Sequence, residues 1–217
     1  MSTVVEFEKV VAVAGSFPVL TGLDLRVDQG EIVLLRGENG AGKTSFLRTC
    51  AGLIAVNSGD ACVLGFDMGV DRRAPRRYIG LLGHENHLYR DLWVREHVEF
   101  RAAAAGAAES DTDAALEKVG VPEQLWTVPI GSLSAGQRRK VAIASLVVGR
   151  PRLWLLDEPH ATLDMKSREN LDLILGEASA SGATIIFASH ERPPTNGLAS
   201  RVITMGGGRV LEDSGAS

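Results

Sequence analysis

The sequence predicts an α/β fold with a mainly parallel β-sheet. Leu153–Leu156 and Thr184–Ala188 are short, largely apolar runs of the kind that form strands buried on both faces of a sheet. Another apolar run, Glu31–Leu35, leads through a glycine-rich loop into a helix expected over Thr44–Ile54. Strands that alternate with helices in this way are typical of parallel sheets.

Both ends of the chain show antiparallel patterns instead. Val4–Val13 is predicted as an edge strand, and Leu23–Val27, whose residues alternate in character, as a second strand. Asn57–Gly59 is typical of a turn, and Asp60–Gly65 is predicted as a further strand. These segments predict an antiparallel β piece near the N-terminus. Arg201–Leu211, with three glycines near its centre, predicts a hairpin.

The segment Asp91–Trp126 differs in composition from the rest of the chain. It is rich in Ala and Glu and contains few β-branched residues, which favours helix. We therefore expect one domain over residues 1–217, in which a helical subdomain at residues 91–131 interrupts an α/β core formed by residues 1–90 and 132–217.

Composition limits the classes of partner. The 217 residues carry a formal net charge of −4, which argues against a nucleic-acid binder that works through bulk positive charge. No apolar run approaches the roughly 20 residues that a membrane span needs, so we expect another chain to cross any membrane at which this protein works. Cys50 and Cys62 lack metal-ligand spacing, and we expect two buried thiols.

The strongest local signal is the glycine-rich loop after Glu31–Leu35, which matches the phosphate-binding pattern GxxxxGK[ST]. Glycines let backbone N–H groups curl around a phosphate chain, and the N-terminus of the next helix points at the same phosphates. Lys43 supplies a positive charge for the β- and γ-phosphates, and Thr44 a hydroxyl for Mg²⁺. The predicted binding residues of this loop are Gly37, Glu38, Asn39, Gly40, Ala41, Gly42, Lys43 and Thr44.

Two further segments carry candidate chemistry. Leu133–Gln137, with the sequence LSAGQ, opens a helix predicted over Ser134–Val148; it is either a second anion site at a helix N-terminus or a simple N-cap. The apolar strand before Asp157 and Glu158 places both carboxylates at its carboxyl end, where ligands of open α/β sheets bind. Asp157 can hold Mg²⁺ and Glu158 can activate water; an exposed acidic turn is the alternative.

In the order GENGAGKT, LSAGQ, LWLLDEP, ATLD and ASH, these motifs resemble the ATPase domains of ABC transporters, and the resemblance spans Leu20–Leu211. It implies a P-loop NTPase of the ABC type that binds ATP and Mg²⁺ and hydrolyses ATP. Glu158 would be the catalytic base, and His190 the residue that senses the γ-phosphate. Phosphate and Mg²⁺ contacts would come from Lys43, Thr44, Ser45 and Asp157.

The same resemblance implies two kinds of partner. Ser134, Gly136 and Gln137 of one chain would close over the ATP of a second, head-to-tail copy, with the D-loop Ala161–Asp164 at the seam. A loop around His84–Leu92 would pass the motion to a membrane-spanning subunit, on the cytoplasmic face of the cell membrane. The alternatives are a soluble ABC ATPase outside transport and a regulator that binds nucleotide without hydrolysis.

The sequence departs from the common ABC pattern at two positions. An adenine-stacking aromatic is replaced by Ala14, so either Phe17 substitutes for it or adenine is held loosely. His84 aligns with the glutamine that usually reaches toward Mg²⁺ and water; a surface loop residue is the alternative. The combination of these two departures with LSAGQ resembles the sequence pattern of the haem-exporter ATPase of cytochrome c biogenesis.

Several other residues are expected on solvated surfaces. The remaining histidines are predicted on surface or loop positions, and the run of basic residues within Ser134–Val148 is predicted on a solvated helix face. These residues are His87, His97 and His160, and Arg138, Arg139 and Lys140.

Overall fold

The computed structural model describes residues 2–190 and 197–215. Contacts divide the chain into two compact units. The first unit comprises Met1–Leu81, Arg152–Pro159 and Gly176–Ser217, and the second comprises Leu82–Pro151 and His160–Leu175. The predicted division into an α/β core and a helical subdomain at residues 91–131 stays a prediction. The bounds of the two compact units differ from those of the predicted core and subdomain.

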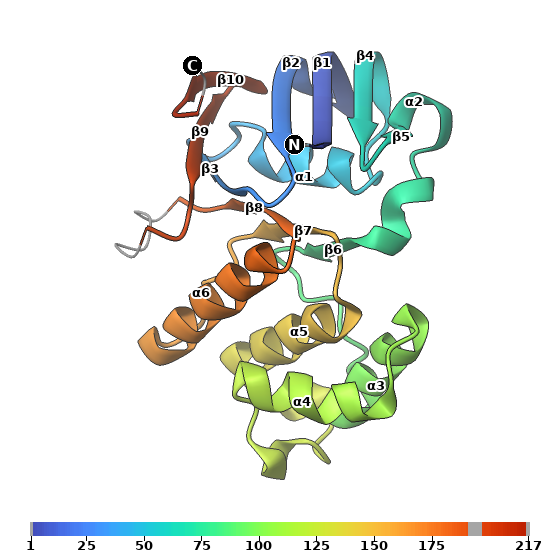
Figure 1. Ribbon diagram of the computed structural model, residues 1–217, viewed down its shortest axis with the longest axis vertical. Helices are drawn as coiled ribbons and strands as arrows, with labels where there is room; N and C mark the ends of the chain where they lie inside the picture. The colour runs from blue at the N-terminus through green and yellow to red at the C-terminus, as the bar shows by residue number, and fades with distance from the viewer. Residues whose placement is uncertain (1, 191–196, 216–217) are drawn as a thin grey trace. The chain divides into compact units, whose positions relative to one another are not determined.

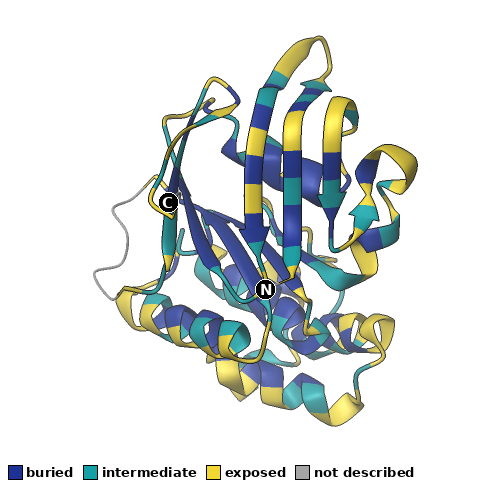
Figure 2. Cartoon of the chain, turned by 45° about the horizontal axis from the view of Figure 1, so that its top comes forward, coloured by how far each residue is buried: buried dark blue, intermediate teal, exposed yellow. Residues whose placement is uncertain are grey.

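A six-stranded sheet forms the centre of the first unit, in the order β10-β9-β3-β8-β7-β6. β3 pairs in parallel with β8 and β9, and β7 pairs in parallel with β8, whereas β10 is antiparallel to β9. Every residue of β7 and β8 is buried (Figure 2), as is typical of strands inside a parallel sheet. The strands are β3 (Ile32–Arg36), β6 (Ile79–Leu82), β7 (Leu153–Asp157), β8 (Thr184–Ala188), β9 (Arg201–Gly206) and β10 (Arg209–Asp213).

A second, antiparallel sheet of the first unit has the strand order β2-β1-β4-β5. Figure 1 shows β1, β2 and β4 side by side. Their bounds are β1 (Thr3–Ala14), β2 (Phe17–Asp28), β4 (Val56–Val63) and β5 (Phe66–Asp67). The predicted α/β fold, with an N-terminal antiparallel piece and a C-terminal hairpin, is confirmed.

The turn predicted at Asn57–Gly59 is wrong, because these residues lie inside β4. Ser58 pairs with Val11 of β1, across a shift in register. Gly59 has φ +81°, and a Cβ there would lie 2.4 Å from the carbonyl oxygen of Lys9. The glycine therefore serves a bulge in which two strands approach closely, and sheet pairing overrides the local preference for a turn.

Helix α1 (Lys43–Cys50) belongs to the core of the first unit and contacts β2, β7 and β8. Phe46 of α1 meets Phe7 of β1 edge to face, with ring centroids 5.4 Å apart, which is a favoured aromatic geometry. The helix ends four residues before the predicted limit at Ile54. Two short helices, α2 (Met68–Asp71) and the 3₁₀ helix η1 (Ala74–Tyr78), precede β6.

The second unit is mainly helical, and its helices α3, α4 and α5 contact one another. Arg95 of α3 pairs with Asp113 of α4 at 2.8 Å. Gly106, with φ +73°, ends α3 and separates it from α4. The helices are α3 (Val94–Ala105), α4 (Glu109–Val119), η2 (Glu123–Leu125), η3 (Ile130–Ser132), α5 (Ala135–Gly149) and α6 (Met165–Ala180), the last of which continues into the first unit.

Within the described residues, no helix has the length and apolar character to cross a membrane. The two cysteines differ in burial. Cys50 of α1 is buried, as predicted, but Cys62 of β4 is only partly buried, because alternate residues of that strand face solvent.

Candidate nucleotide-binding site

The glycine-rich loop lies between β3 and α1, at the carboxyl end of a parallel strand. Gly42 takes φ +104° and stands at the N-cap of α1, where no side chain caps the helix. Within the loop, the N–H of Ala41 donates to the carbonyl of Glu38 at 3.1 Å. An uncapped helix start directs its first N–H groups, and the positive end of its dipole, toward the loop, which suits an anion.

Lys43, the first residue of α1, turns its side chain back into this loop. Its Nζ donates to the carbonyl of Gly37 at 2.7 Å and to that of Glu38 at 3.0 Å. The residue is buried, so the ammonium group is held by loop carbonyls instead of bulk water. The loop therefore has a fixed positive charge beside the helix N-terminus.

Thr44 and Asp157 are brought together although they lie 113 residues apart in the chain. Thr44 Oγ1 donates to Oδ2 of Asp157 at 2.8 Å, and Asp157 is buried at the end of β7. Adjacent oxygen ligands in an octahedral Mg²⁺ site lie about 3.0 Å apart, because each Mg–O distance is about 2.1 Å. The spacing of this hydroxyl and carboxylate therefore fits a Mg²⁺ ion.

Glu158 and His190 form a second pair, at the ends of β7 and β8. Oε1 of Glu158 accepts a hydrogen bond from the backbone N–H of His190 at 3.0 Å, and lies 2.8 Å from Nδ1 of the same residue. Oε2 accepts a longer bond from the hydroxyl of Ser189, at 3.4 Å. Glu158 has φ +49°, an uncommon value for a residue with a side chain, which is found at functional sites.

The LSAGQ segment belongs to the second unit. Ser134 caps α5: its Oγ accepts from the N–H of Gln137 at 3.2 Å, and Oε1 of Gln137 accepts from the N–H of Ser134 at 2.8 Å. The N-cap interpretation is thus confirmed. It is compatible with an anion site, because a hydroxyl that accepts one bond still has its own hydrogen to donate.

The family of the chain follows from sequence comparison. Residues 20–161 match the family described as ABC transporter. The chain belongs to the ABC transporter family. It is 38% identical over 194 residues to the cytochrome c biogenesis ATP-binding export protein CcmA of Rhodopseudomonas palustris (strain BisB5), with 89% of this chain and 94% of that protein covered. It is 34% identical over 217 residues to the glutamine transport ATP-binding protein GlnQ of Escherichia coli (strain K12), with 96% and 90% covered.

The fold of this ABC transporter chain matches solved cassettes. The dimeric post-hydrolysis structure of the ATP-binding cassette MJ0796, bound to ADP and Pi, superposes with a TM-score of 0.87 at 22% identity, and 96% of this chain and 97% of that chain are covered. The family match and the relatives make the chain an ABC-type ATPase that binds ATP. The predicted resemblance, including that to the ATPase of cytochrome c biogenesis, is confirmed.

The second departure from the common ABC pattern, His84, lies in the loop after β6 and is exposed. Arg139 of α5 anchors this loop, because its Nη1 donates to the carbonyl of Gly83 at 2.8 Å and to Oδ1 of Asn86 at 2.9 Å. Arg139 is buried, so its predicted place on a solvated face is wrong. A guanidinium has five N–H donors and can bind several acceptors of one loop. Because Arg139 lies in a run of three basic residues, the sequence did not distinguish it from its solvated neighbours.

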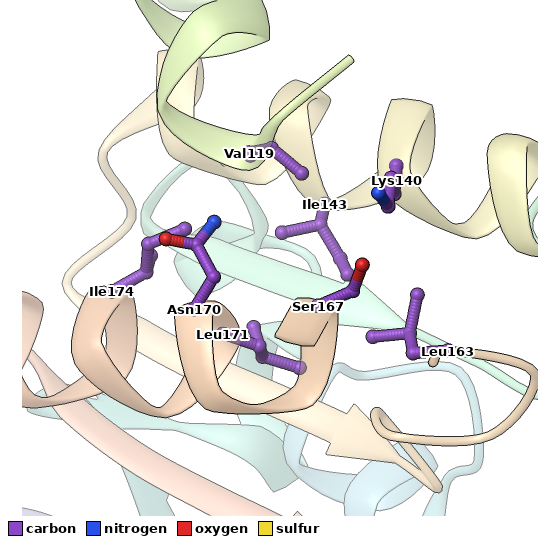
Figure 3. A pocket seen from close by; sticks show the side chains of 8 residues that line it. All are labelled: Val119, Lys140, Ile143, Leu163, Ser167, Asn170, Leu171 and Ile174. Atoms are coloured by element: carbon purple, nitrogen blue, oxygen red, sulfur yellow. The ribbon is translucent and has the colours of Figure 1, made fainter. Parts of the chain in front are cut away.

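The D-loop of this ABC ATPase is fixed by both of its ends. His160 Nε2 lies 2.7 Å from Oδ1 of Asp172, and both side chains are nearly buried. His160 thus lies in a loop, one of its two predicted positions, but its side chain does not face solvent. Asp164 caps α6 by accepting from the N–H of Ser167 at 2.8 Å, and this bond lowers the pKa of its carboxyl. Leu163 lines a small, filled depression (Figure 3), with Val119, Lys140, Ile143, Ser167, Asn170, Leu171 and Ile174.

Ala14 and Phe17 face each other across the turn between β1 and β2, and both are exposed. Phe17 is 76% exposed, so its ring is available for stacking. The choice between Phe17 and loosely held adenine stays open as a prediction.

Two features near the site were not predicted. Ser189 is buried beside Glu158. It is part of the ASH motif, of which only His190 was predicted to have a role. The turn at Gly206–Gly208 contacts the phosphate loop through a hydrogen bond from the N–H of Gly208 to the carbonyl of Ala41, at 3.0 Å. The run of three glycines was the only signal for it.

Proposed function

We propose that this chain is the ATP-hydrolysing subunit of a transporter and drives a separate membrane-spanning partner. The observation that carries the proposal is the set of groups at the carboxyl ends of β3, β7 and β8: the loop with Lys43, the bonded pair Thr44 and Asp157, and Glu158 held by His190. Charge and oxygen donors suited to a nucleotide's phosphates thus converge on one edge of the sheet.

The phosphate loop, Gly37–Thr44 with Ser45, holds the phosphates of ATP. Its backbone N–H groups and the N-terminus of α1 bind phosphate oxygens, and Lys43 exchanges its bonds to Gly37 and Glu38 for the β- and γ-phosphates. Thr44 and Asp157 hold Mg²⁺, which supplies positive charge to the phosphate oxygens when it is bound.

Glu158 is the base that takes a proton from the attacking water. Because a carboxylate accepts hydrogen bonds, Nδ1 of His190 carries the hydrogen between them, and Nε2 of a neutral ring can only accept. His190 can therefore donate to a γ-phosphate only when its ring is protonated. In this arrangement, His190 orients the carboxylate of Glu158 and also contacts the γ-phosphate, so that the position of Glu158 depends on whether the γ-phosphate is present.

Removal of the loop lysine tests the binding site. Lys43→Ala should abolish turnover and weaken ATP affinity about 10- to 100-fold, because a hydrogen bond to a charged group contributes roughly 1.5–3 kcal/mol. The measurements are steady-state ATPase rates and ATP titration. Lys166→Ala removes an exposed lysine of α6 and is the matched control. Normal turnover of Lys43→Ala would refute the assignment of the phosphate loop.

Two chains pair head to tail in the ATP-bound state, with Ser134, Gly136 and Gln137 of each chain over the nucleotide of the other. Support comes from the start of α5, since the N-terminus of a helix favours an anion, and from the dimeric cassette MJ0796. Glu158→Gln keeps an oxygen that can accept from His190 but removes the base, so turnover should fall about 100-fold or more while ATP stays bound.

Size-exclusion chromatography of Glu158→Gln should therefore show a dimer that depends on ATP and Mg²⁺. Ser134→Arg, placed in the same chain, should abolish it, because the long side chain occupies the space of the phosphate. Ser134→Ala loses the same helix cap without the added bulk, and is the control. A Glu158→Gln chain that stays monomeric at saturating ATP would contradict head-to-tail pairing.

The membrane-spanning partner docks on aromatic residues of the second unit. Tyr89, Trp93 and Phe100 are 58%, 48% and 50% exposed, and the rings of Tyr89 and Phe100 lie 5.7 Å apart. Exposed apolar groups that cluster in this way mark interaction sites. The partner would hold the chain on the cytoplasmic face of the membrane. Cargo is chosen by the partner, since relatives of similar identity are named for different processes, cytochrome c biogenesis and glutamine transport.

Cell fractionation tests the partner. In the native host, the chain should sediment with membranes, and Tyr89→Ser with Phe100→Ser should release it while its basal ATPase rate is kept. Val70→Ser changes an equally apolar exposed residue of the first unit and should have no effect. Recovery with nucleic acid, or in the soluble fraction alone, would favour an ABC ATPase outside transport.

A further inference from the structure

The turn between β9 and β10 lies directly against the phosphate loop. The N–H of Gly208 donates to the carbonyl of Ala41 at 3.0 Å. A Cβ at Gly42 would lie 3.1 Å from Cα of Gly208, and one at Gly37 would lie 2.2 Å from the carbonyl oxygen of Met205. The loop is thus in contact, at both of its ends, with backbone from the C-terminal hairpin.

β2 holds the same turn from its other side. The N–H of Thr21 donates to the carbonyl of Gly208 at 3.1 Å, and its hydroxyl donates to that of Gly207 at 2.7 Å. Nε of Arg209 lies 2.6 Å from the carbonyl oxygen of Thr21 and 3.0 Å from its hydroxyl. Every one of these bonds is local to the first unit, and together they tie β2, the turn and the loop.

The hydrogen bond from Gly208 to Ala41 fixes the direction in which a backbone carbonyl of the phosphate loop points. A loop binds phosphate when its N–H groups point inward and its carbonyls point outward. The Gly208 N–H gives the outward carbonyl of Ala41 a fixed partner, next to the residue that caps α1. A loop held in this way does not have to be ordered when the nucleotide arrives.

We propose that the turn Gly206–Gly208, locked by Thr21, positions the phosphate loop for nucleotide binding. The inference rests on the proposed function of that loop and adds Gly208 and Thr21 as positioning residues. Neither residue is part of a motif that binds nucleotide by itself. The effect they have is on the shape of the loop before ATP arrives.

Two neighbouring glycines of the turn allow a matched test. Gly207 and Gly208 have φ +56° and +77°, so an alanine at either position has the same left-handed backbone strain. A Cβ at Gly207 meets nothing within 4 Å, whereas one at Gly208 would lie 2.8 Å from the carbonyl oxygen of Val19 and 3.2 Å from the nitrogen of Thr21. Only the second substitution forces the turn to shift against β2, and this shift disturbs the hydrogen bond from Gly208 to Ala41.

Calorimetric titration with ADP and Mg²⁺ should separate the two variants. Gly208→Ala should weaken ADP binding about tenfold, the equivalent of one hydrogen bond, whereas Gly207→Ala should stay within about twofold of the unmodified chain. Thermal unfolding of both variants is measured alongside, and both should lose stability. Equal ADP affinities for the two variants would overturn the inference. An unmodified chain that binds neither ADP nor ATP would instead overturn the proposed function.

A second series applies even if Gly208→Ala fails to fold. Thr21→Val keeps the shape of the side chain but loses the hydroxyl that donates to Gly207 and accepts from Arg209. Because the loop contacts phosphate in the ground state and the transition state alike, KM for ATP should rise about threefold to tenfold while kcat changes less than about twofold. Thr21→Ser should restore KM. A fall in kcat without a rise in KM, or no rescue by Ser, would refute the positioning role.

Discussion

The buried histidine of α3 makes the stability of the fold sensitive to acid. His97 is 2% exposed, and its Nδ1 has no hydrogen-bond partner among the residues that the structure describes. Burial, with a smaller contribution from the positive charge of Arg101, lowers the pKa of His97 from 6.5 to about 4. The predicted surface position of His97 is therefore wrong, and the ring is held neutral.

The direction of the pH effect follows from the two pKa values. Between pH 6.5 and about 4 the unfolded chain binds a proton at His97 and the folded chain does not, so stability falls as the pH falls through this range. From those values, His97 lowers the free energy of unfolding by about 2 kcal/mol between pH 7 and pH 5. His97→Leu removes the titrating ring and should lose this part of the pH dependence.

The assay is urea unfolding, followed by tryptophan fluorescence, at intervals from pH 8 to pH 5. The quantity of interest is the difference between the unmodified chain and His97→Leu, since every other group titrates in both. His84→Gln changes an exposed histidine of the same unit and is the matched control. Parallel stability curves for the unmodified chain and His97→Leu would refute the reasoning.

Three further predictions concern single residues. If His84 takes the place of the usual glutamine, His84→Gln should keep most of the ATPase activity, because it restores the amide that this position usually carries; a large loss of activity would contradict that role. Gly136→Ala should lower the free energy of unfolding by about 1–3 kcal/mol, because its Cβ would lie 2.8 Å from a backbone carbonyl, whereas Gly149→Ala in the same helix meets nothing and should raise it by up to about 1 kcal/mol. Iodoacetamide should modify Cys62 before Cys50 in the native chain, since burial raises the pKa of both thiols but Cys62 is only partly buried and the reagent can reach it; equal rates, followed by mass spectrometry, would contradict this.

Local motifs made much of the fold and site predictable. The glycine-rich loop, the apolar strand that ends in Asp157 and the helix that starts after Ser134 each depend on neighbours in sequence, and their secondary structure follows the prediction. The strands and helices that carry these motifs alternate along the chain, and this order limits the number of possible sheet topologies.

The errors concern residues whose environment is set by distant segments. Arg139 and His97 look like surface residues in sequence, but neighbouring segments of the second unit bury them. Asn57–Gly59 has turn composition, yet pairing with β1 decides its structure. Gly208 acts through Ala41 and Thr21, which lie far away in the chain, so nothing in its immediate sequence indicates that contact.

The place of β3 in its sheet has a consequence for synthesis of the chain. β3 leaves the ribosome early, but both strands that pair with it, β8 and β9, lie in the last third of the sequence. A nascent chain can therefore form the antiparallel β1–β2 hairpin at once, yet the strands on both sides of β3 and the turn at Gly206–Gly208 are added only when translation is almost complete. A chain that stops before β9 should therefore lack a formed ATP site, and unfinished copies should not consume ATP.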